Sequence, residues 1–178
     1  MPLFALDSGD DATVEKQLKW VEKVYNFYGF RVVFWPYRRK NIKNTIPLKG
    51  LIGPHSGEVM DIWGAAVRLY GGQISYILPV VFAEFESDRI AGATWDVGQG
   101  PKHGLIGSMM TGITATKPMC TVNTRVCSLL TTAHEIGHAA GLDHDVDEHN
   151  LMFGTDKRIS YGLRVDQVVQ IIGSSFAY

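Results

Sequence analysis

The residues of this sequence best suited to chemistry lie close together in its C-terminal third. From Ala133 to Asp145 the chain reads Ala-His-Glu-Ile-Gly-His-Ala-Ala-Gly-Leu-Asp-His-Asp. His134 and His138 are four residues apart, so on a helix they point within about 40° of each other and lie about 6 Å apart along the axis. Two imidazoles in that arrangement can bind one metal ion.

Three neighbouring residues extend this pair into a site. Glu135 follows the first histidine on the metal-facing side, where its carboxylate can hydrogen-bond a water molecule on the metal without replacing a ligand. Gly141 permits the left-handed turn that ends a helix, so the chain can double back and bring His144 to the same metal. Three nitrogen ligands leave the fourth position of tetrahedral zinc open, which is typical of a catalytic site. The sequence therefore predicts one catalytic zinc ion.

A chance pattern and a structural metal site are the two alternatives to a catalytic zinc. A His-Glu-x-x-His pattern can arise by chance on a surface helix, but the full string from His134 to His144 fixes five positions. A structural metal site would leave Glu135 without a role and would need a fourth protein ligand. Cys127 lies about 10 Å from the first histidine along a helix axis, and Cys120 would reach the metal only through a loop.

The two cysteines allow two interpretations. A disulfide between Cys120 and Cys127 could brace the loop before the zinc-binding helix. Both could equally be reduced and act as small hydrophobic residues. One pair is too few to indicate a redox compartment.

The string from His134 to His144 resembles the zinc signature of the metzincins, a clan of zinc metallopeptidases with a methionine turn beneath the metal. Met152, within the sequence Leu-Met-Phe, follows the third histidine by eight residues, which is similar to the matrixin branch, where Leu-Met-Tyr usually stands. The sequence from Leu163 to Val168 resembles the start of the final matrixin helix. The chain is thus identified as metzincin-like and closest to the matrixins.

The sequence also departs from the families of this clan. Asp145 follows the third histidine, as in adamalysins, whereas vertebrate matrixins commonly have serine there. Gly154 stands where astacins have a metal-binding tyrosine, so that ligand is absent. The sequence shows no Pro-Arg-Cys-Gly inhibitory motif and no clear ligand set for the structural zinc and calcium ions of matrixins. The subfamily is therefore left open.

The resemblance implies an α/β fold of metzincin type in a single catalytic domain, residues 1–178. An upper subdomain, residues 1–141, would hold a twisted mixed β-sheet with two main helices above the active-site cleft. A small lower subdomain, residues 142–178, would carry the methionine turn and the final helix. Met152 would lie under the site as a hydrophobic plug.

The resemblance also implies the reaction and the place where substrate binds. Zinc would polarise the scissile carbonyl and lower the pKa of its water, while Glu135 would take a proton and pass it to the leaving amine. Metzincins bind an extended peptide antiparallel to an edge strand, and the residues expected to do this are Ala91, Gly92, Ala93 and Thr94. An ordinary core strand with a bulge at Gly92 is the alternative. Residues 153–161 would form a wall of the pocket beyond the scissile bond, with Tyr161 helping to stabilise an oxyanion.

We therefore predict a zinc-dependent metalloendopeptidase that hydrolyses protein or peptide substrates. Three alternatives remain open. The protein could be a secreted toxin or effector protease that cuts one host protein, or an aminopeptidase, although no group that would hold a free amine is evident. The third alternative is a zinc-binding interaction module without turnover, against which the intact Glu135 argues.

Composition and charge limit the partners that we expect. The 178 residues suit one domain with a hydrophobic core, and 17 Lys and Arg against 18 Asp and Glu disfavour nucleic acid as a partner. The apolar run 77–83 is broken by Pro79 and is too short to span a bilayer. The first residues lack the features of a signal peptide, although the family resemblance favours a secreted protein. We expect a monomer.

The elements that must position the site follow from hydrophobic periodicity and from turn residues. Helices are expected at 11–28, from Asn123 or Thr124 through His138 to Gly141, and at 163–172. Strands are expected at 30–35, 74–86, 90–95 and 105–113, with a loop at 96–104 and either a helix or a strand at 58–70.

The zinc-binding helix is expected to be apolar on the side away from its ligands. The residues of this apolar face, expected to bury against the sheet, are Leu129, Ala133, Ile136 and Ala140. The remaining histidines are expected on the surface or in loops, at His55, His103 and His149.

Overall fold

The computed structural model describes residues 3–5, 11–34, 57, 61, 62, 64, 78–97, 117–155, 157–174, 176 and 177. The bounded helices within these residues are α1 (Asp11–Phe27), α3 (Thr131–Ala139) and α4 (Val165–Ile172). The strands are β1 (Leu3–Ala5), β2 (Val80–Ala83), β3 (Gly92–Val97) and β4 (Lys117–Asn123). The fold is therefore a small mixed α/β arrangement, as expected.

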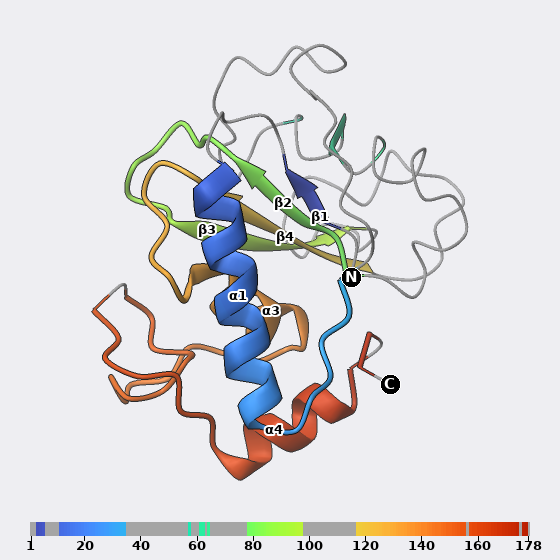
Figure 1. Ribbon diagram of the computed structural model, residues 1–178, viewed down its shortest axis with the longest axis vertical. Helices are drawn as coiled ribbons and strands as arrows, with labels where there is room; N and C mark the ends of the chain where they lie inside the picture. Colours follow the sequence, from blue (N-terminus) through green and yellow to red (C-terminus); the bar gives the residue numbers. More distant parts are fainter. Residues whose placement is uncertain are drawn as a thin grey trace.

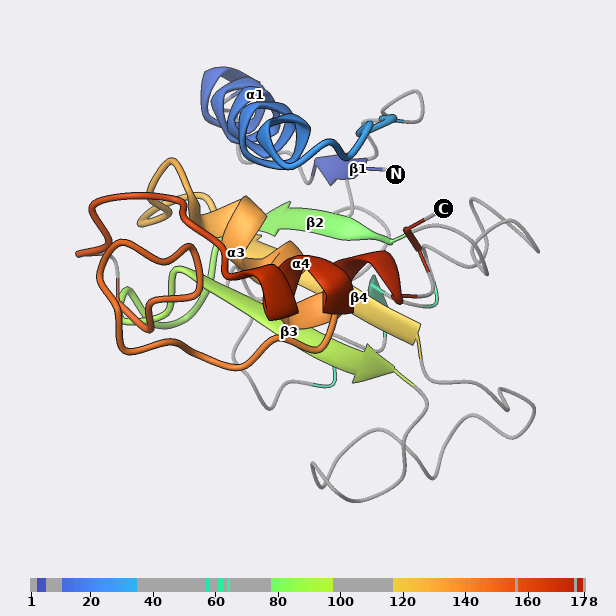
Figure 2. The ribbon, with the colours of Figure 1, turned by 90° about the horizontal axis from the view of Figure 1, so that it is seen from below.

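The four strands form one mixed sheet in the order β1-β2-β4-β3. β1 and β2 are parallel, as are β2 and β4, whereas β3 runs antiparallel to β4 at one end of this order. Figure 2 shows the strands in this sequence from β1 to β3. β3 is thus an edge strand of the described sheet.

The helices lie over the sheet and beyond it. α3 packs against β3 and β4, and α1 packs against α3. In Figure 1, α1 crosses in front of α3, and α4 lies at the end of the molecule away from the sheet. A single cluster of buried apolar side chains joins these elements, among them Val24, Val80, Phe82, Val122, Ile136 and Met152. None of the described helices is long and apolar enough to cross a membrane.

Helix α1 confirms the helix that periodicity predicts at 11–28. Its inward face carries Val14, Val21 and Val24, which are all nearly inaccessible to solvent. Gly29 follows the helix with φ +83°, the left-handed conformation that glycine adopts without a steric penalty. The Phe30 amide then donates to the Tyr25 carbonyl, so the chain turns away from the helix axis.

The strand expected at 30–35 is wrong for its described residues, since 30–34 carry no regular secondary structure. Their side chains nevertheless alternate, with Phe30, Val32 and Phe34 packed against the core and Arg31 and Val33 exposed. The alternating pattern therefore predicts correctly which side chains are buried. A β-strand also requires backbone hydrogen bonds to a neighbouring strand, and these cannot be predicted from periodicity.

Strand β4 lies where no strand is predicted, and the helix that carries His134 and His138 begins later than predicted. Asn123 ends β4 and does not cap a helix, because residues 117–123 pair with β2 on one side and β3 on the other. Its carboxamide oxygen instead accepts hydrogen bonds from the amides of Phe85 and Arg125. Helix α3 begins only at Thr131, so Leu129 lies before it and is 48% exposed, and its predicted burial is wrong.

The other expected elements differ mainly at their ends. The strand expected at 74–86 is confirmed as buried but is only four residues long, and β3 runs to Val97, into the expected loop at 96–104. Asp61, Ile62 and Gly64 are helical, whereas most of 58–70 and all of 105–113 lie outside the described residues, as do His55 and His103. Helix α4 confirms the last expected helix within two residues at its start.

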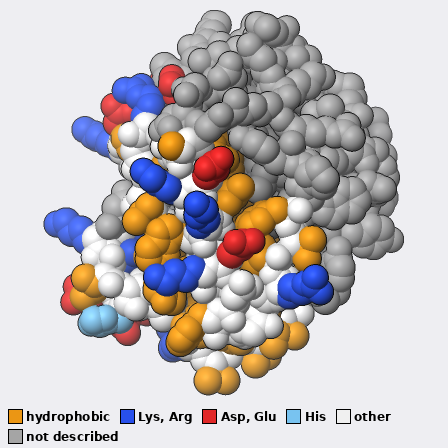
Figure 3. All heavy atoms as spheres, in the orientation of Figure 1, with side chains coloured by type: hydrophobic (Ala, Val, Ile, Leu, Met, Phe, Trp, Pro, Cys, Tyr) orange, Lys and Arg blue, Asp and Glu red, His pale blue; other side chains and the backbone are white. Residues whose placement is uncertain are grey.

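The apolar face expected on the zinc-binding helix is otherwise confirmed. Ala133, Ile136 and Ala140 are buried in the core cluster. Helix α4, in contrast, leaves Val165, Val169 and Ile172 exposed, and hydrophobic side chains gather over that end of the molecule in Figure 3.

Candidate metal centre

Helix α3 carries two of the three predicted ligands, and α1 holds its first turn in place. The residue at its N-cap, Leu130, makes no side-chain cap hydrogen bond. The Gln17 carboxamide on α1 takes over this function, because its oxygen accepts from the amide and the hydroxyl of Thr132 at 3.1 and 2.7 Å. The Tyr25 hydroxyl donates to the Ala133 carbonyl at 2.9 Å. Both α1 residues are buried.

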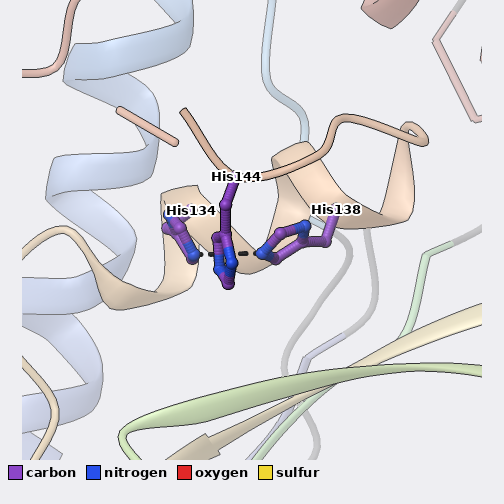
Figure 4. A group of neighbouring side chains, drawn as sticks. All are labelled: His134, His138 and His144. Atoms are coloured by element: carbon purple, nitrogen blue, oxygen red, sulfur yellow. Dashed lines mark hydrogen bonds between the residues drawn. The ribbon is translucent and has the colours of Figure 1, made fainter. Parts of the chain in front are cut away.

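The structure brings together the three predicted histidine ligands. One ring nitrogen from each of His134, His138 and His144 lies within 4.8 Å of the others. Figure 4 shows the first two rings extending from α3 and the third descending from the following loop between them. Gly141 has φ +87°, which is the left-handed turn predicted to bring the loop back.

The hydrogen bonds of two rings leave one nitrogen of each directed at the other. His134 Nδ1 lies 2.8 Å from the Leu151 carbonyl, and His138 Nδ1 lies 2.7 Å from the Leu142 carbonyl. A carbonyl only accepts, so each Nδ1 must be protonated, and in a neutral ring each Nε2 then carries a lone pair. These two Nε2 atoms are 3.1 Å apart. Nitrogens that share a tetrahedral zinc ion lie roughly 3.3 Å apart, so the pair is arranged to bind a cation.

Burial keeps these rings neutral, which is the form that binds a metal. Burial, together with the positive charge of Arg158, lowers the pKa of His134 to about 3. Burial also lowers the pKa of His138, although its hydrogen bond to the Leu142 carbonyl opposes this. His144 is exposed, so the group opens to solvent on the side of the third ring. Three imidazoles in this arrangement could hold a metal ion.

Glu135, the residue after His134 in α3, is buried and is held from β3. The Thr94 hydroxyl donates to Glu135 Oε2 at 2.7 Å and also lies 2.9 Å from the carbonyl of the same residue. The Cys120 thiol donates to that carbonyl at 3.3 Å. Burial raises the pKa of Glu135 to about 7, against the lowering effects of the Thr94 hydroxyl and of Arg158.

The segment after α3 is fixed by contacts within itself and with α3. The Asp145 amide donates to the Met152 carbonyl at 2.8 Å, which ties the residue after the third ligand to the predicted plug. Met152 is fully buried, and a Cβ atom on Gly137 would overlap its sulfur. A Cβ atom on Gly154 would lie 3.3 Å from the His144 ring, so this glycine allows the chain to pass close to the imidazole.

A polar network connects this segment to α4. The Asn150 carboxamide accepts from the Met152 amide and donates to the Gln167 side chain, both at 2.8 Å. Gln167 in turn donates to the Asp145 carboxylate, which also forms an ion pair with the Arg164 guanidinium. The final helix therefore braces the loop that carries the third histidine.

The remaining residues singled out in the sequence fall in several places. No disulfide joins Cys120 and Cys127, so of the two interpretations the structure has reduced cysteines. His149 is exposed, as expected. The Tyr161 ring packs edge-on against Trp20 and Phe27 of α1.

Several residues that position the ligands are not evident from the sequence. Gln17 and Tyr25 lie within a predicted helix, and a buried glutamine on an apolar face is a usable signal for a polar contact. Gly137 occupies an unspecified position within the histidine pattern. The contact of Thr94 with Glu135 joins residues 41 positions apart and leaves no local signal.

The fold and the three-histidine group together define a mixed α/β protein with a candidate metal site. No protein-family model and no curated protein sequence matches this chain. Among solved structures, metalloproteinase-II from Bacteroides fragilis is similar over 99% of this chain, with a TM-score of 0.66 and 18% sequence identity. This chain covers 52% of that chain, which is about half of its length. At this identity the likeness shows that the two share a fold.

Proposed function

We propose that this protein is a zinc-dependent metalloendopeptidase. The observation that carries the proposal is the group of three imidazoles whose nitrogens lie within 4.8 Å of one another, with the buried Glu135 directly after the first of them in α3. The likeness to the Bacteroides metalloproteinase fold supports it. Met152, which is fully buried against Gly137 of α3, is proposed to serve as the methionine-turn plug of metzincins.

The donor set suits zinc. Three neutral imidazole ligands with an open side are typical of catalytic zinc sites, whereas calcium and magnesium prefer oxygen ligands. His134, His138 and His144 would hold the ion, and the carbonyls of Leu151 and Leu142 fix the orientation of the first two rings. When bound, zinc supplies Lewis acidity that polarises a peptide carbonyl and lowers the pKa of a water molecule.

Glu135 is proposed as the general base. Glu135 follows the first proposed ligand in α3 and is not a member of the ligand group, so its carboxylate would be available to accept a proton from the attacking water. The same carboxyl group would then donate the proton to the leaving amine. A buried carboxylate has few competing water contacts, which favours proton transfer to the reacting groups.

Strand β3 is proposed to bind the peptide. The Asn123 amide donates to the Ala91 carbonyl, which places Ala91 and Ala93 in the hydrogen-bonded register with β4. Backbone groups alternate in direction along an antiparallel strand, so the amides and carbonyls of Gly92 and Thr94 point to the outer edge. An extended peptide could pair with that edge by strand addition. Of the four predicted substrate residues, Gly92 and Thr94 would therefore make these hydrogen bonds.

The decisive experiment combines zinc quantification with cleavage-site profiling. Wild type and Glu135→Gln would be incubated with a library of N-acetylated, C-amidated peptides and with denatured casein. We expect about one zinc per chain in both proteins and internal cleavage by wild type, reduced about 10²- to 10⁴-fold in the variant.

The same profile separates the alternatives. Cleavage of peptides with free amino ends alone would indicate an aminopeptidase, and cleavage of very few sequences would indicate a narrow toxin or effector. Equal behaviour of wild type and Glu135→Gln on every peptide would contradict the proposed enzyme and leave a zinc-binding module.

A further inference from the structure

We propose that Thr94 is the positioning residue for the Glu135 carboxylate. Its hydroxyl fixes the proposed general base relative to β3, the strand proposed to bind the peptide. This inference rests on the proposed function of the site. It goes beyond that function because it assigns the Thr94 side chain, and not only its backbone, to the reaction. Three contacts between β3 or β4 and Glu135 carry it.

The first contact is a close approach between Glu135 and the backbone of β3. A Cβ atom on Gly92 would lie 2.7 Å from both Cγ and Oε1 of Glu135, which is closer than such atoms can approach. The glutamate side chain therefore rests against the strand at the one place where a side chain is missing. Any larger residue at this position would push the carboxylate away from its present place.

The second contact is the hydrogen bond from Thr94. Residues 92 and 94 of a strand face the same side of the sheet, so the hydroxyl stands next to the space left by the glycine. It donates to Oε2 at 2.7 Å, while Oε1 lies towards Gly92. A carboxylate held at one oxygen and confined along its stem has little rotational freedom.

The third contact comes from Cys120 of β4. A threonine hydroxyl has a single proton, and the Glu135 carbonyl is also within reach at 2.9 Å. Cys120 lies directly opposite Thr94 across the β3–β4 pair, and its thiol donates to that same carbonyl. The Thr94 hydroxyl also lies 3.8 Å from the Cys120 sulfur, and of the acceptors within its reach the carboxylate is the strongest.

Thr94 belongs to both halves of the proposed site. Its backbone points to the outer edge of β3, where a peptide would pair, and its side chain points to Glu135. A peptide that pairs with β3 would thus be placed at a fixed distance from the base. We infer that Thr94 contributes to the turnover step more than to substrate affinity.

The test compares Thr94→Val, which keeps the β-branched shape without the hydroxyl, with Thr94→Ser, which keeps the hydroxyl. The matched control is Thr121→Val, a buried threonine of β4 whose hydroxyl bonds the Ala93 carbonyl and the Trp95 ring nitrogen. The substrate is the blocked peptide that wild type cuts best in the profiling experiment. Zinc content is measured for each variant, and crystal structures of wild type and Thr94→Val compare the position of the Glu135 carboxylate.

For Thr94→Val we expect a fall in kcat of about 10- to 100-fold with little change in KM, unchanged zinc content and a displaced carboxylate. Thr94→Ser should recover most of kcat, and Thr121→Val should lose stability but keep kcat. An unchanged kcat in Thr94→Val, or a carboxylate that stays in place, would overturn the inference. If Glu135→Gln is also fully active, the proposed function itself has failed; if only Thr94→Val is active, that function stands.

Discussion

Gly137 and Met152 are so close that a Cβ atom on the glycine would overlap the methionine sulfur. The glycine lies in the middle of α3, where alanine would ordinarily stabilise the helix by about 1 kcal/mol. It is therefore the Met152 side chain, and not helix propensity, that requires glycine there. Met152 is packed directly against the helix that carries two of the candidate ligands.

We expect Gly137→Ala to lower the free energy of unfolding by about 1–3 kcal/mol, because overpacking outweighs the gain in helix propensity. Urea unfolding of the metal-free protein would measure the change. In the double variant Gly137→Ala, Met152→Ala the overlap is gone, so the two single effects should not add. Additive effects would show that the Met152 side chain moves aside and relieves the overlap without a cost in stability.

Replacement of Gln17 by leucine should destabilise the protein by about 1–3 kcal/mol. The change removes an acceptor from the amide and hydroxyl of Thr132 and a donor from the Ser128 carbonyl, so buried polar groups at the start of α3 lose their partners. Denaturant unfolding would measure it. Lys16→Ala, an exposed change on the same helix, serves as the control and should have little effect.

Alkaline pH should destabilise the protein in part through Tyr25. Burial raises the pKa of its hydroxyl well above the usual range, so above about pH 10 the unfolded chain loses a proton that the folded protein keeps. The contribution of the Tyr25 hydroxyl to the free energy of unfolding is therefore fully present below about pH 10 and is lost as the pH rises.

Tyr25→Phe should remove this contribution to the fall in the free energy of unfolding with rising pH. It should also cost about 1 kcal/mol at neutral pH, because the hydrogen bond to the Ala133 carbonyl is lost. Unfolding would be followed between about pH 8 and 11 in a Cys120→Ala background, since burial raises the pKa of that thiol as well. If the free energy of unfolding falls equally steeply with pH in the proteins with and without the tyrosine hydroxyl, the prediction is contradicted.

Zinc should stabilise the folded protein through the three histidines. At a free concentration about 100 times the dissociation constant, the gain is about 2.7 kcal/mol, and removal of zinc by a chelator should reverse it. His138→Ala should abolish both the bound zinc and the zinc-dependent rise in Tm. His149→Ala, a change at an exposed histidine outside the group, should preserve both. Undiminished zinc in His138→Ala would show that the ligand set is wrong.

The sequence was sufficient to predict the ligand group because its geometry is mostly local. His134 and His138 lie one helical turn apart, and any helix through them brings their rings together. Gly141 marks the left-handed turn that returns His144 to the same place, and the structure has that turn at φ +87°. The helices α1 and α4 were likewise readable, since each has an apolar period and a terminal glycine.

Other features depend on contacts that no local pattern encodes. At the end of β4, Asn123 is a residue typical of a helix N-cap, so the local sequence predicts the start of a helix. The segment is a strand because it pairs with β2 and β3. Residues 30–34 show the converse, since they alternate like a strand but belong to none. In both cases hydrogen bonding to a distant segment decided the outcome.

Helical spacing alone shows which residues can bind a metal and which glutamate follows the first of them, because His134, Glu135 and His138 lie within about one turn. How those side chains are held depends on contacts between distant parts of the chain. Gln17 caps α3 from 115 residues away, Thr94 holds Glu135 from 41 residues away, and the Leu151 carbonyl orients His134 from the following loop. Such hydrogen bonds join segments that meet only when apolar burial folds the chain, so their partners cannot be read from spacing.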